Sequence, residues 1–472
     1  MKKILIAAPK SGSGKTLLTC ALIENLKRRG IKVAAKKCGP DYIDPMFHRK
    51  VLGIPSGNLD TFFTDKNTTL SILNDTVDSD TFLVIEGVMG LFDGLGGTKA
   101  EGSSYQLAEY TNAGIILVVD ARGAGYSLLA QIKGFLDFDR CGLIKGVILN
   151  KISKGFYETI KPLIEDELDI KVLGYLENIK DFSIESRHLG LKLPYEVDDL
   201  KNIIDRLYEI SKDSIDIESI MDIANDENGA LEDSEIDLYA EKKICKNDFE
   251  YVTGNTYDKS KKRPCVAVSK DEAFSFIYEE NINMLQKYAD VVFFSPLHDT
   301  EIPEDVDGLY LVGGYPENFL DELKENISIK DDIRSKIKMG MPIVAECGGF
   351  MYLTSGIYDE DILYDMCGVF DSKCKRKERL VRFGYIELSE KKPNFMDKGE
   401  IIKAHEFHYY DTSYNGIDCI AKKPTTGKEY DCIIDTDNIF AGFPHLYFPS
   451  NEKFVRKFVK KCENYREIQN CK

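Results

Sequence analysis

The sequence predicts an α/β protein with two domains, each built around a mainly parallel sheet. Short apolar runs alternate with helix-like segments in both halves of the chain, which is typical of parallel strands joined by helices. The length of 472 residues exceeds what a single core usually supports. An acidic stretch that is poor in aromatic residues separates the halves. We therefore expect a first domain over residues 1–211, a linker over 212–262 and a second domain over 263–472.

Composition limits the partners that this chain can have. The net charge of −17 opposes binding to a phosphate backbone, so no nucleic-acid partner is expected. No apolar run approaches the roughly 20 residues of a membrane span, and the first one is too short for a signal peptide. The twelve cysteines are scattered without a C-x-x-C pair, as in reduced cytoplasmic proteins. We expect a cytoplasmic protein without a membrane partner, for which a homodimer is one open oligomeric state.

The first predicted strand, residues 4–7, leads into a glycine-rich loop and then into a leucine-rich helix. The glycines permit a tight turn that points N–H groups at an anion, and the positive end of the helix adds to that field. The lysine is expected to reach the outer phosphates of ATP, and the threonine to hold Mg²⁺. Pro9 replaces the first glycine of the usual G-x-x-x-x-G-K-[ST] spacing, so the loop is a variant. The ATP-binding candidates here are Gly12, Ser13, Gly14, Lys15 and Thr16.

Two further predicted strands, residues 31–35 and 81–85, each end in a loop that contains carboxylates. Loops at the carboxyl ends of parallel strands gather around the ligand, so these side chains are expected near the threonine of the phosphate loop. An aspartate beside a proline can also simply form a turn. The metal candidates are Thr16, Asp41 and Glu86, and the candidates for substrate contact or support of the metal are Asp44 and Asp93.

Three more strands are predicted at residues 115–119, 147–149 and 172–176. Asn150 follows the second of them, where its amide could face the Watson–Crick edge of a purine, so we include it among the ATP-binding candidates. Arg187 lies in a later loop and could clamp a phosphate or a carboxylate.

In the second half, strands are predicted at residues 264–268, 291–294, 309–312 and 341–345, with β-like alternation later in the chain. Cys347 lies in a sharp turn between the last of these strands and a helix, flanked by small residues, as in a nucleophile elbow. We expect the helix N-terminus to stabilise the thiolate and to lower the thiol pKa. The backbone N–H groups of Gly348 and Gly314 are candidates for an oxyanion hole.

Together these segments resemble the cobyrinate a,c-diamide synthase family. The segments that carry the resemblance are Lys10–Thr16, Gly39–Pro45, Glu86–Gly94, Ser186–Leu191, Ala345–Gly349 and His405–His408. The resemblance implies an N-terminal phosphate-loop domain similar to dethiobiotin synthetase and a C-terminal domain similar to the class I glutamine amidotransferases. It implies amidation of the a and c acetate groups of cobyrinate, in cobalamin biosynthesis, with ATP, Mg²⁺ and L-glutamine.

The class I resemblance also selects the general base. His445 follows an aromatic run late in the chain, where these enzymes carry their histidine, and His405 with His408 is the competing pair. An acidic residue often stands two positions after that histidine, but here the residue is Tyr447, which leaves open what orients the imidazole. Candidates to meet a polycarboxylate macrocycle are Lys36, Lys37, Lys99, Arg187 and Arg382.

Three alternatives remain at this point. A nickel-sirohydrochlorin a,c-diamide synthase of coenzyme F430 biosynthesis shares the motifs and differs in its macrocycle. A cobyric acid synthase acts on other side chains, and the Gly39–Pro45 and Arg187-His188 segments favour the diamide enzyme over it. A partition-type ATPase with an inert glutaminase domain is disfavoured by the intact cysteine elbow.

Overall fold

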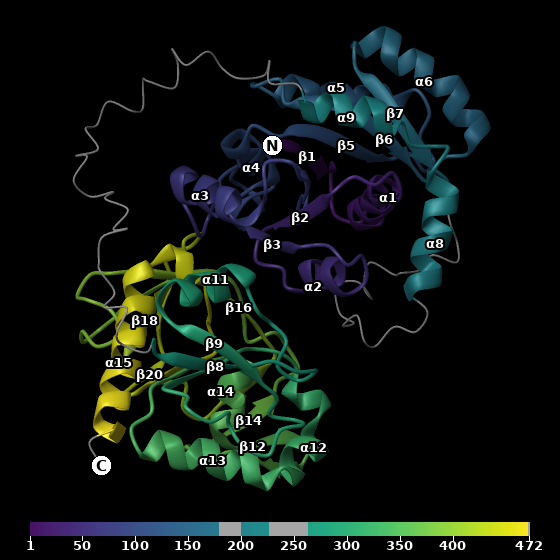
Figure 1. The fold of residues 1–472 in the computed structure, drawn as a ribbon. Coiled ribbons are helices and arrows are strands. Elements are labelled where there is room, and N and C mark those ends of the chain that lie inside the picture. The colour runs from purple at the N-terminus through teal and green to yellow at the C-terminus, as the bar shows by residue number, and fades with distance from the viewer. Residues whose placement is uncertain (179–199, 226–262, 471–472) are drawn as a thin grey trace. The chain divides into compact units, whose positions relative to one another are not determined.

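The computed structural model describes residues 1–178, 200–225 and 263–470 (Figure 1). The chain divides into two compact units, Met1–Thr256 and Tyr257–Lys472. Among the described residues, no helix has both the length and the apolar character that crossing a bilayer requires.

The N-terminal unit alternates strands and helices, as its sequence predicts. Its described elements are β1 (Lys2–Ala7), α1 (Lys15–Arg28), β2 (Val33–Cys38), α2 (Ile43–Lys50), β3 (Ser56–Leu59), α3 (Lys66–Thr76), β4 (Phe82–Glu86), η1 (Leu95–Gly97), α4 (Ser104–Thr111), β5 (Gly114–Asp120), α5 (Ser127–Phe138), β6 (Ile144–Asn150), α6 (Lys154–Leu168), β7 (Lys171–Leu176), α8 (Leu200–Ser211) and α9 (Ile217–Asn225).

Seven parallel strands form the sheet of this unit in the order β3-β2-β4-β1-β5-β6-β7. One face packs against α1, α8 and α9, and the other against α3, α4, α5 and α6. Because helices cover both faces, the central strands are continuous apolar runs rather than alternating ones. The phosphate loop and the loops after β2 and β4 therefore share the carboxyl edge of one sheet.

Two segments differ from the sequence-based expectation. The second strand extends through Lys36, Lys37 and Cys38 because its backbone pairs with β4 on one side and with β3 on the other, so the expected loop begins later. The range expected as a linker begins with α9, whose Ile217 and Ile220 are buried in the N-terminal core. The rest of that range, residues 226–262, lies outside the described residues.

The C-terminal unit contains more strand than the N-terminal unit. Its described elements are β8 (Cys265–Ser269), α11 (Glu279–Tyr288), β9 (Asp290–Phe294), β10 (Gly308–Leu311), η3 (Pro316–Asn318), α12 (Leu320–Glu325), α13 (Ile327–Lys338), β11 (Ile343–Glu346), α14 (Gly348–Leu353), β12 (Thr354–Asp359), β13 (Ile362–Asp365), β14 (Phe370–Arg376), β15 (Arg382–Glu390), β16 (Ile402–His408), β17 (Tyr410–Thr412), β18 (Cys419–Lys422), β19 (Glu429–Cys432), β20 (Ile434–Asp435), β21 (Ile439–Gly442), β22 (His445–Leu446), η4 (Phe448–Ser450) and α15 (Glu452–Asn470).

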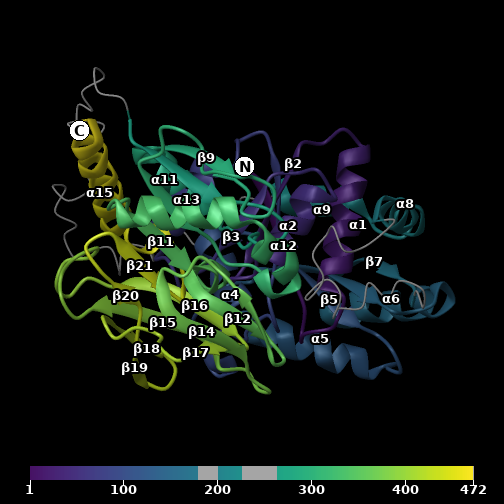
Figure 2. The same cartoon turned by 90° about the horizontal axis from the view of Figure 1, so that it is seen from below.

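The main sheet of the C-terminal unit has the order β20-β21-β11-β10-β8-β9, and only its edge strand β20 is antiparallel among the described strands. Two smaller sheets, β13-β12-β14-β17 and β19-β18-β15-β16-β22, contain the β-rich last third of the chain (Figure 2). Strand β22 joins the second small sheet through its pairing with β16. This pairing places His445 directly opposite His405.

The C-terminal helix α15 closes the core of its unit with aromatic side chains. Phe454 is fully buried, and its ring centroid lies 5.1 Å from that of Phe440, 5.7 Å from that of Phe448 and 6.0 Å from that of Phe395. Ring pairs at such separations add to the free energy that burial alone provides.

Replacing Phe454 by Ala is expected to destabilise the C-terminal unit by about 3–5 kcal/mol, because it removes a ring from a packed cluster and leaves a cavity. Pulse proteolysis in increasing urea, with fragments of the C-terminal unit identified by mass spectrometry, measures the change. Ile468→Ala on the same helix is the control, since that side chain is 56% exposed. Equal shifts in the two variants would contradict this account of the core.

Candidate functional sites

The phosphate loop of the N-terminal unit has the conformation that its glycines predict. Gly12 and Gly14 have φ values of 76° and 97°, in the left-handed region that side chains disfavour. A Cβ atom on Gly14 would also lie 2.1 Å from Nδ2 of Asn150. Helix α1 begins at Lys15, directly after the turn. The loop thus presents backbone N–H groups at a helix N-terminus, which is a suitable cradle for phosphate.

Asn150 supports this loop from the end of β6. Its Nδ2 donates to the Ser13 carbonyl at 2.8 Å, and its Oδ1 accepts from the Lys151 backbone N–H at 2.9 Å. Lys151 in turn donates to the Gly12 carbonyl at 3.0 Å. The sequence predicts that the Asn150 amide faces a purine base; in the structure its Nδ2 bonds to the phosphate loop, and the contact with a base stays a prediction.

Lys15 contacts the glycine-rich loop that follows β4. Its Nζ donates to the Met89 carbonyl at 2.5 Å. Burial and the charge of Lys37 lower the pKa of Lys15 to about 8. Asp93 folds the same loop, since its Oδ2 accepts from the Gly90 N–H at 3.0 Å.

A buried ionic cluster lies beside the loop at the carboxyl ends of β2 and β4. Thr16 Oγ1 donates to Glu86 Oε1 at 2.6 Å, and Lys37 Nζ donates to the same oxygen at 2.9 Å. Lys37 also forms an ion pair with Asp44 of α2. His48 Nε2 lies 3.3 Å from the other Glu86 oxygen. Sequence reasoning assigned no role to His48, which lies in α2 three residues after the Gly39–Pro45 segment.

In this cluster, burial and ion pairing shift the pKa values of Lys37 and Glu86 in opposite directions. Burial by itself lowers the pKa of Lys37, but Asp44 and Glu86 raise it well above its usual value. Burial raises the pKa of Glu86, yet Lys37 and His48 bring it below its usual range. Burial and the charge of Glu86 raise the pKa of Asp44. Lys37 and Glu86 therefore form the ionised pair.

The predicted Mg²⁺ ligands fit the ion to different degrees. Thr16 and Glu86 present neighbouring oxygens, and Mg²⁺ typically takes one or two protein oxygens besides phosphate oxygens and water. Asp41 uses Oδ1 to accept from the backbone N–H groups of Ile43 at 2.7 Å and Asp44 at 3.4 Å, as a turn-forming aspartate does. Among the described residues, no group of three or more His, Cys, Asp or Glu side chains could hold a metal by itself.

The side chains predicted to meet a macrocycle are dispersed. Lys36 and Lys37 are buried within β2, and Lys37 lies between Glu86 and Asp44, so it does not present its charge to solvent. Lys99 is exposed. Arg382, in the other unit, stacks on the Tyr430 ring with its guanidinium carbon 3.6 Å from the ring centroid. The remaining candidate, Arg187, lies outside the described residues.

In the C-terminal unit, Cys347 has the backbone of a nucleophile elbow. Its φ of 44° and ψ of −107° are disfavoured for any side chain. Two neighbours hold this conformation, since the Cys347 N–H donates to the Gly442 carbonyl at 2.8 Å and the Met351 N–H donates to the Cys347 carbonyl at 2.8 Å. The side chain is 6% exposed.

His445 and the expected oxyanion-hole residues surround this cysteine. A Cβ atom built on Gly313 would lie 2.3 Å from Cε1 of His445 and 3.4 Å from Cβ of Cys347, so Gly313 leaves room for both side chains. A Cβ atom on Gly348 would lie 3.1 Å from the backbone N of Gly314. The structure thus brings Gly314 and His445, which are distant in the chain, to the elbow formed by Cys347 and Gly348.

The expected low pKa of the cysteine is not observed. Burial, followed by the charge of Glu317, raises the pKa of the Cys347 thiol well above its usual value. Helix α14 has only six residues, and its dipole does not offset that burial. Burial also lowers the pKa of His445 to about 3. The resting site therefore holds a neutral thiol beside a neutral imidazole, which can accept a proton.

Glu346, which immediately precedes Cys347, is a site residue that sequence reasoning missed. One carboxylate oxygen lies 3.9 Å from Nδ1 of His445, and the other accepts from the Leu446 N–H at 3.1 Å. Burial raises the pKa of Glu346 to about 8. An acidic group thus lies beside the imidazole although Tyr447 replaces the acid of the usual pattern.

The competing histidines occupy other environments. His408 stacks on Phe443, with ring centroids 4.1 Å apart, and its Nδ1 lies 2.6 Å from the Tyr410 carbonyl. His405 faces His445 across the β16–β22 pair. Burial and the charge of Lys423 lower the pKa of His405 to about 3.

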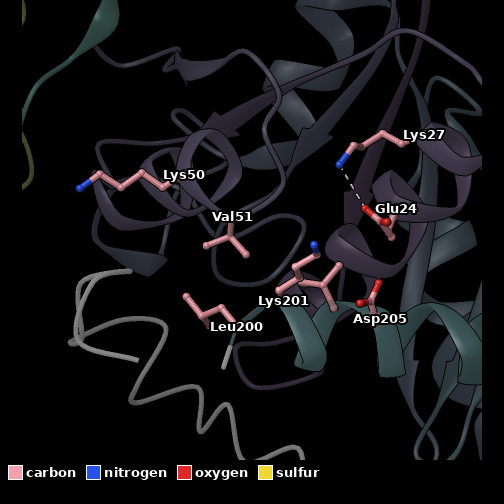
Figure 3. A pocket seen from close by; sticks show the side chains of 8 residues that line it. Glu24, Lys27, Lys50, Val51, Leu200, Lys201 and Asp205 are labelled. Atoms are coloured by element: carbon pink, nitrogen blue, oxygen red, sulfur yellow. Dashed lines mark hydrogen bonds and ion pairs between the residues drawn. The ribbon is translucent and has the colours of Figure 1, made fainter. Parts of the chain in front are cut away.

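A separate cavity of 460 Å³ lies between α1, the end of α2 and α8 (Figure 3). Lys27 and Glu24 on its wall form an ion pair at 3.2 Å, and Lys27 also donates to the Leu52 carbonyl at 2.5 Å. The charges of Lys27 and Glu24 are therefore paired within the wall. The full lining is Glu24, Lys27, Lys50, Val51, Leu200, Lys201, Ile204 and Asp205.

Comparison with known domains defines the class. Residues 4–191 match the CobQ/CobB/MinD/ParA nucleotide binding domain, and residues 265–453 match the CobB/CobQ-like glutamine amidotransferase domain. Together with the phosphate loop and the cysteine elbow, these matches define a glutamine amidotransferase that carries its own nucleotide-binding domain.

Full-length relatives define the family. The chain is 36% identical over 470 residues to a cobyrinate a,c-diamide synthase of Priestia megaterium, covering 98% of this chain and 97% of the relative. It is 37% identical over 477 residues to one of Thermoplasma volcanium, covering 99% of each chain. A third relative with this name, from Clostridium tetani, is 35% identical over 466 residues, covering 98% of this chain and all of the relative. The chain belongs to the cobyrinate a,c-diamide synthase family, which confirms the resemblance of its motifs.

The burial of Cys347 predicts slow alkylation that depends on pH. Without glutamine, its reaction with iodoacetamide should accelerate about tenfold per pH unit from pH 7 to 9, because the raised thiol pKa leaves little thiolate over that range. Mass spectrometry of the peptide that contains Cys347 measures the rate, with Cys347→Ser as the control. A rate that levels off below pH 8 would contradict the raised pKa.

Proposed function

We propose that this protein is a cobyrinate a,c-diamide synthase that uses ATP, Mg²⁺ and L-glutamine to amidate the a and c acetate groups of cobyrinate. The observation that carries this proposal is the Cys347 elbow with His445 beside it, in a chain that also has a phosphate loop and matches its relatives over nearly their full length. A nucleotide switch without transferase activity would not need such an elbow.

The N-terminal unit is proposed to activate the carboxylate. A carboxylate oxygen of the macrocycle attacks the γ-phosphorus of ATP, ADP leaves, and an acyl phosphate forms; ammonia then attacks the acyl carbon and phosphate leaves. Lys15 would exchange its contact with Met89 for the transferred phosphoryl group, while the backbone of Gly12–Gly14 holds the other phosphates. Thr16 and Glu86 would hold Mg²⁺, which offsets charge on the phosphates when bound.

The C-terminal unit is proposed to release ammonia from glutamine. His445 takes the proton of the Cys347 thiol, and the thiolate attacks the amide carbon. The N–H groups of Gly314 and Gly348 would stabilise the oxyanion that forms. The imidazolium then gives its proton to the departing ammonia, and water hydrolyses the glutamyl thioester to glutamate and free thiol.

Glu346 is proposed to position His445 and to offset its charge during this step. A buried imidazolium is unfavourable in free energy unless an anion lies close to it. One Glu346 carboxylate oxygen lies 3.9 Å from Nδ1 of His445. The other Glu346 oxygen accepts a hydrogen bond from the Leu446 N–H. Leu446 follows His445 in β22, so this bond would hold the carboxylate beside the imidazole. Glu346 would thus take the place of the acid that the usual pattern has at the position of Tyr447.

The macrocycle is tested by supplying cobyrinate and nickel-sirohydrochlorin separately with ATP, Mg²⁺ and glutamine, and by following the mass gain per amide. Two amides on cobyrinate, and none on the nickel macrocycle, are expected. Amidation of nickel-sirohydrochlorin alone would assign the protein to coenzyme F430 biosynthesis instead.

Two substitutions separate the proposed half-reactions. Cys347→Ala should abolish glutamine-dependent amidation but retain the activity with added ammonia, because the acyl phosphate still forms. Lys15→Ala should lose both activities, by about 100-fold or more, since the transferred phosphoryl group loses its cation. Mass spectrometry of the product measures both, and a Cys347 variant that still used glutamine would refute the second site.

Glu346→Gln should lower kcat for glutamine hydrolysis by about tenfold to 100-fold, because an amide cannot offset the imidazolium charge. The wild-type rate should rise as pH passes about 8, where Glu346 ionises, and this rise should be absent in the variant. Amidation with added ammonia is the control and should be unchanged. An unaltered pH profile would mean that Glu346 supports only the fold.

A further inference from the structure

Three exposed aromatic rings lie side by side at one end of the β15–β16 pair in the C-terminal unit. Phe383, Phe407 and Tyr409 are 62%, 37% and 40% exposed. Phe383 and Phe407 are directly opposite in the two strands, and their ring centroids are 5.8 Å apart. The centroids of Phe407 and Tyr409 are 6.1 Å apart. We call these three rings the aromatic row. Contiguous apolar surface of this kind is typical of a binding site rather than of an ordinary protein surface.

The aromatic row lies on the same face of its sheet as the histidine of the glutaminase site. Residues directly opposite in a strand pair, and residues two apart in a strand, point to the same face. Phe407 and His405 of β16 therefore share a face with Phe383 of β15, and the ring centroids of Phe383 and His405 are 5.8 Å apart. His405 is directly opposite His445 in the β16–β22 pair. A molecule that covers the row would thus lie on the side of this sheet that carries His445.

A basic loop connects β14 to β15 beside the aromatic row. Residues 373–382 contain six Lys or Arg side chains and one acidic side chain, in a chain whose net charge is −17. Lys377 and Arg379 are exposed, and neither side chain forms an ion pair within the described part of the chain. Arg382, which precedes Phe383 in β15, points to the opposite face and stacks on Tyr430. The charges available to a ligand are therefore those of the loop itself.

Two backbone hydrogen bonds hold this loop against the end of β16. The Lys377 N–H donates to the Tyr409 carbonyl at 2.9 Å, and the Val381 N–H donates to the His408 carbonyl at 3.0 Å. The guanidinium carbon of Arg376 lies 5.9 Å from the centroid of the Tyr409 ring. Cations and exposed rings therefore form one continuous surface.

A polycarboxylate macrocycle has the chemistry that this surface fits. Its ring system is broad and roughly flat, so it can stack on aromatic side chains, and the carboxylates at its rim can pair with Lys and Arg. The acidic chain as a whole repels such an anion, and Lys36 and Lys37 are buried in β2. We propose that the aromatic row and the basic loop bind the macrocycle, with Phe383 against its face and Lys377 and Arg379 at its carboxylates. This inference rests on the proposed function.

The two kinds of contact would respond differently to salt. Pairs between exposed charges weaken as ionic strength rises, whereas the stacking of rings does not depend on charge. The macrocycle would be held by the unit that releases ammonia, on the face that carries His445. The C-terminal unit would then bind the acceptor of the nitrogen as well as its donor.

Equilibrium dialysis of cobyrinate against the full-length protein, at several salt concentrations, measures Kd. Lys377→Ala combined with Arg379→Ala should raise Kd about tenfold at low salt, because two ion pairs are lost, and should flatten its dependence on salt. Phe383→Ser should raise Kd about fivefold at every salt concentration, because a stacked ring is lost. Phe383→Tyr should bind as the wild type does. KM for cobyrinate in amidation with added ammonia should rise by the same factors, with kcat little changed.

Matched substitutions elsewhere in the same unit are the controls. Phe293→Ser removes a ring of β9 that is 44% exposed and lies 4.4 Å from Nζ of Lys270, so it also has a cation beside it. Lys338→Ala combined with Lys392→Ala removes two exposed lysines and changes the net charge by the same amount as the loop variant. Both controls should keep the wild-type Kd. Urea unfolding should show equal stability in all variants, since each replaced side chain is exposed.

Each result supports or overturns the inference. If Kd is the same in the wild type, the loop variant and Phe383→Ser, the inference is wrong and the proposed function stands. It is also wrong if the control variants raise Kd equally, because only the overall charge or apolar surface then matters. If the variants change the sedimentation coefficient of the protein alone but not Kd, the aromatic row is a contact between two copies of the chain, which contradicts the inference. If the wild type neither binds nor amidates cobyrinate, the proposed function fails and the inference fails with it.

Discussion

The hydrogen bond from the Cys347 N–H to the Gly442 carbonyl is the contact on which the second site depends. It continues the parallel pairing of β11 with β21 past the end of the strand, and so fixes the backbone where φ becomes positive. The same strand leads within three residues to His445. A single ladder therefore sets both the direction of the thiol and the location of the imidazole.

Burial, rather than helix dipoles, controls the charges of this site. The thiol and the imidazole are both 6% exposed or less, and removal from water favours the neutral form of each. A neutral thiol beside a neutral imidazole avoids the free-energy cost of a buried charge in the resting site. Glu346, with one carboxylate oxygen 3.9 Å from Nδ1 of His445, is proposed to offset the positive charge that the imidazole would gain during turnover.

The N-terminal unit, in contrast, contains a buried pair that is ionised, Lys37 and Glu86. Lys37 lies between Glu86 and Asp44 with almost no exposure, so removing Glu86 would leave the buried lysine charge uncompensated. This arrangement fixes Glu86 beside Thr16 at the edge of the phosphate loop. The Glu86 carboxylate is thereby held next to the phosphate loop. Lys37, which sequence reasoning assigned to the substrate, is instead held inside this cluster.

The sequence by itself determined the two parallel sheets, the phosphate loop and the cysteine elbow, because each depends on local signals: apolar runs, glycines at tight turns and a nucleophile between strand and helix. Only the tertiary structure decided that Asn150 bonds to the phosphate loop, that β2 continues through Lys37, and that Glu346 lies beside His445. The pKa of the Cys347 thiol was also decided by the tertiary structure alone. Desolvation and ion pairing depend on what surrounds a side chain in space, and no local pattern of residues encodes that.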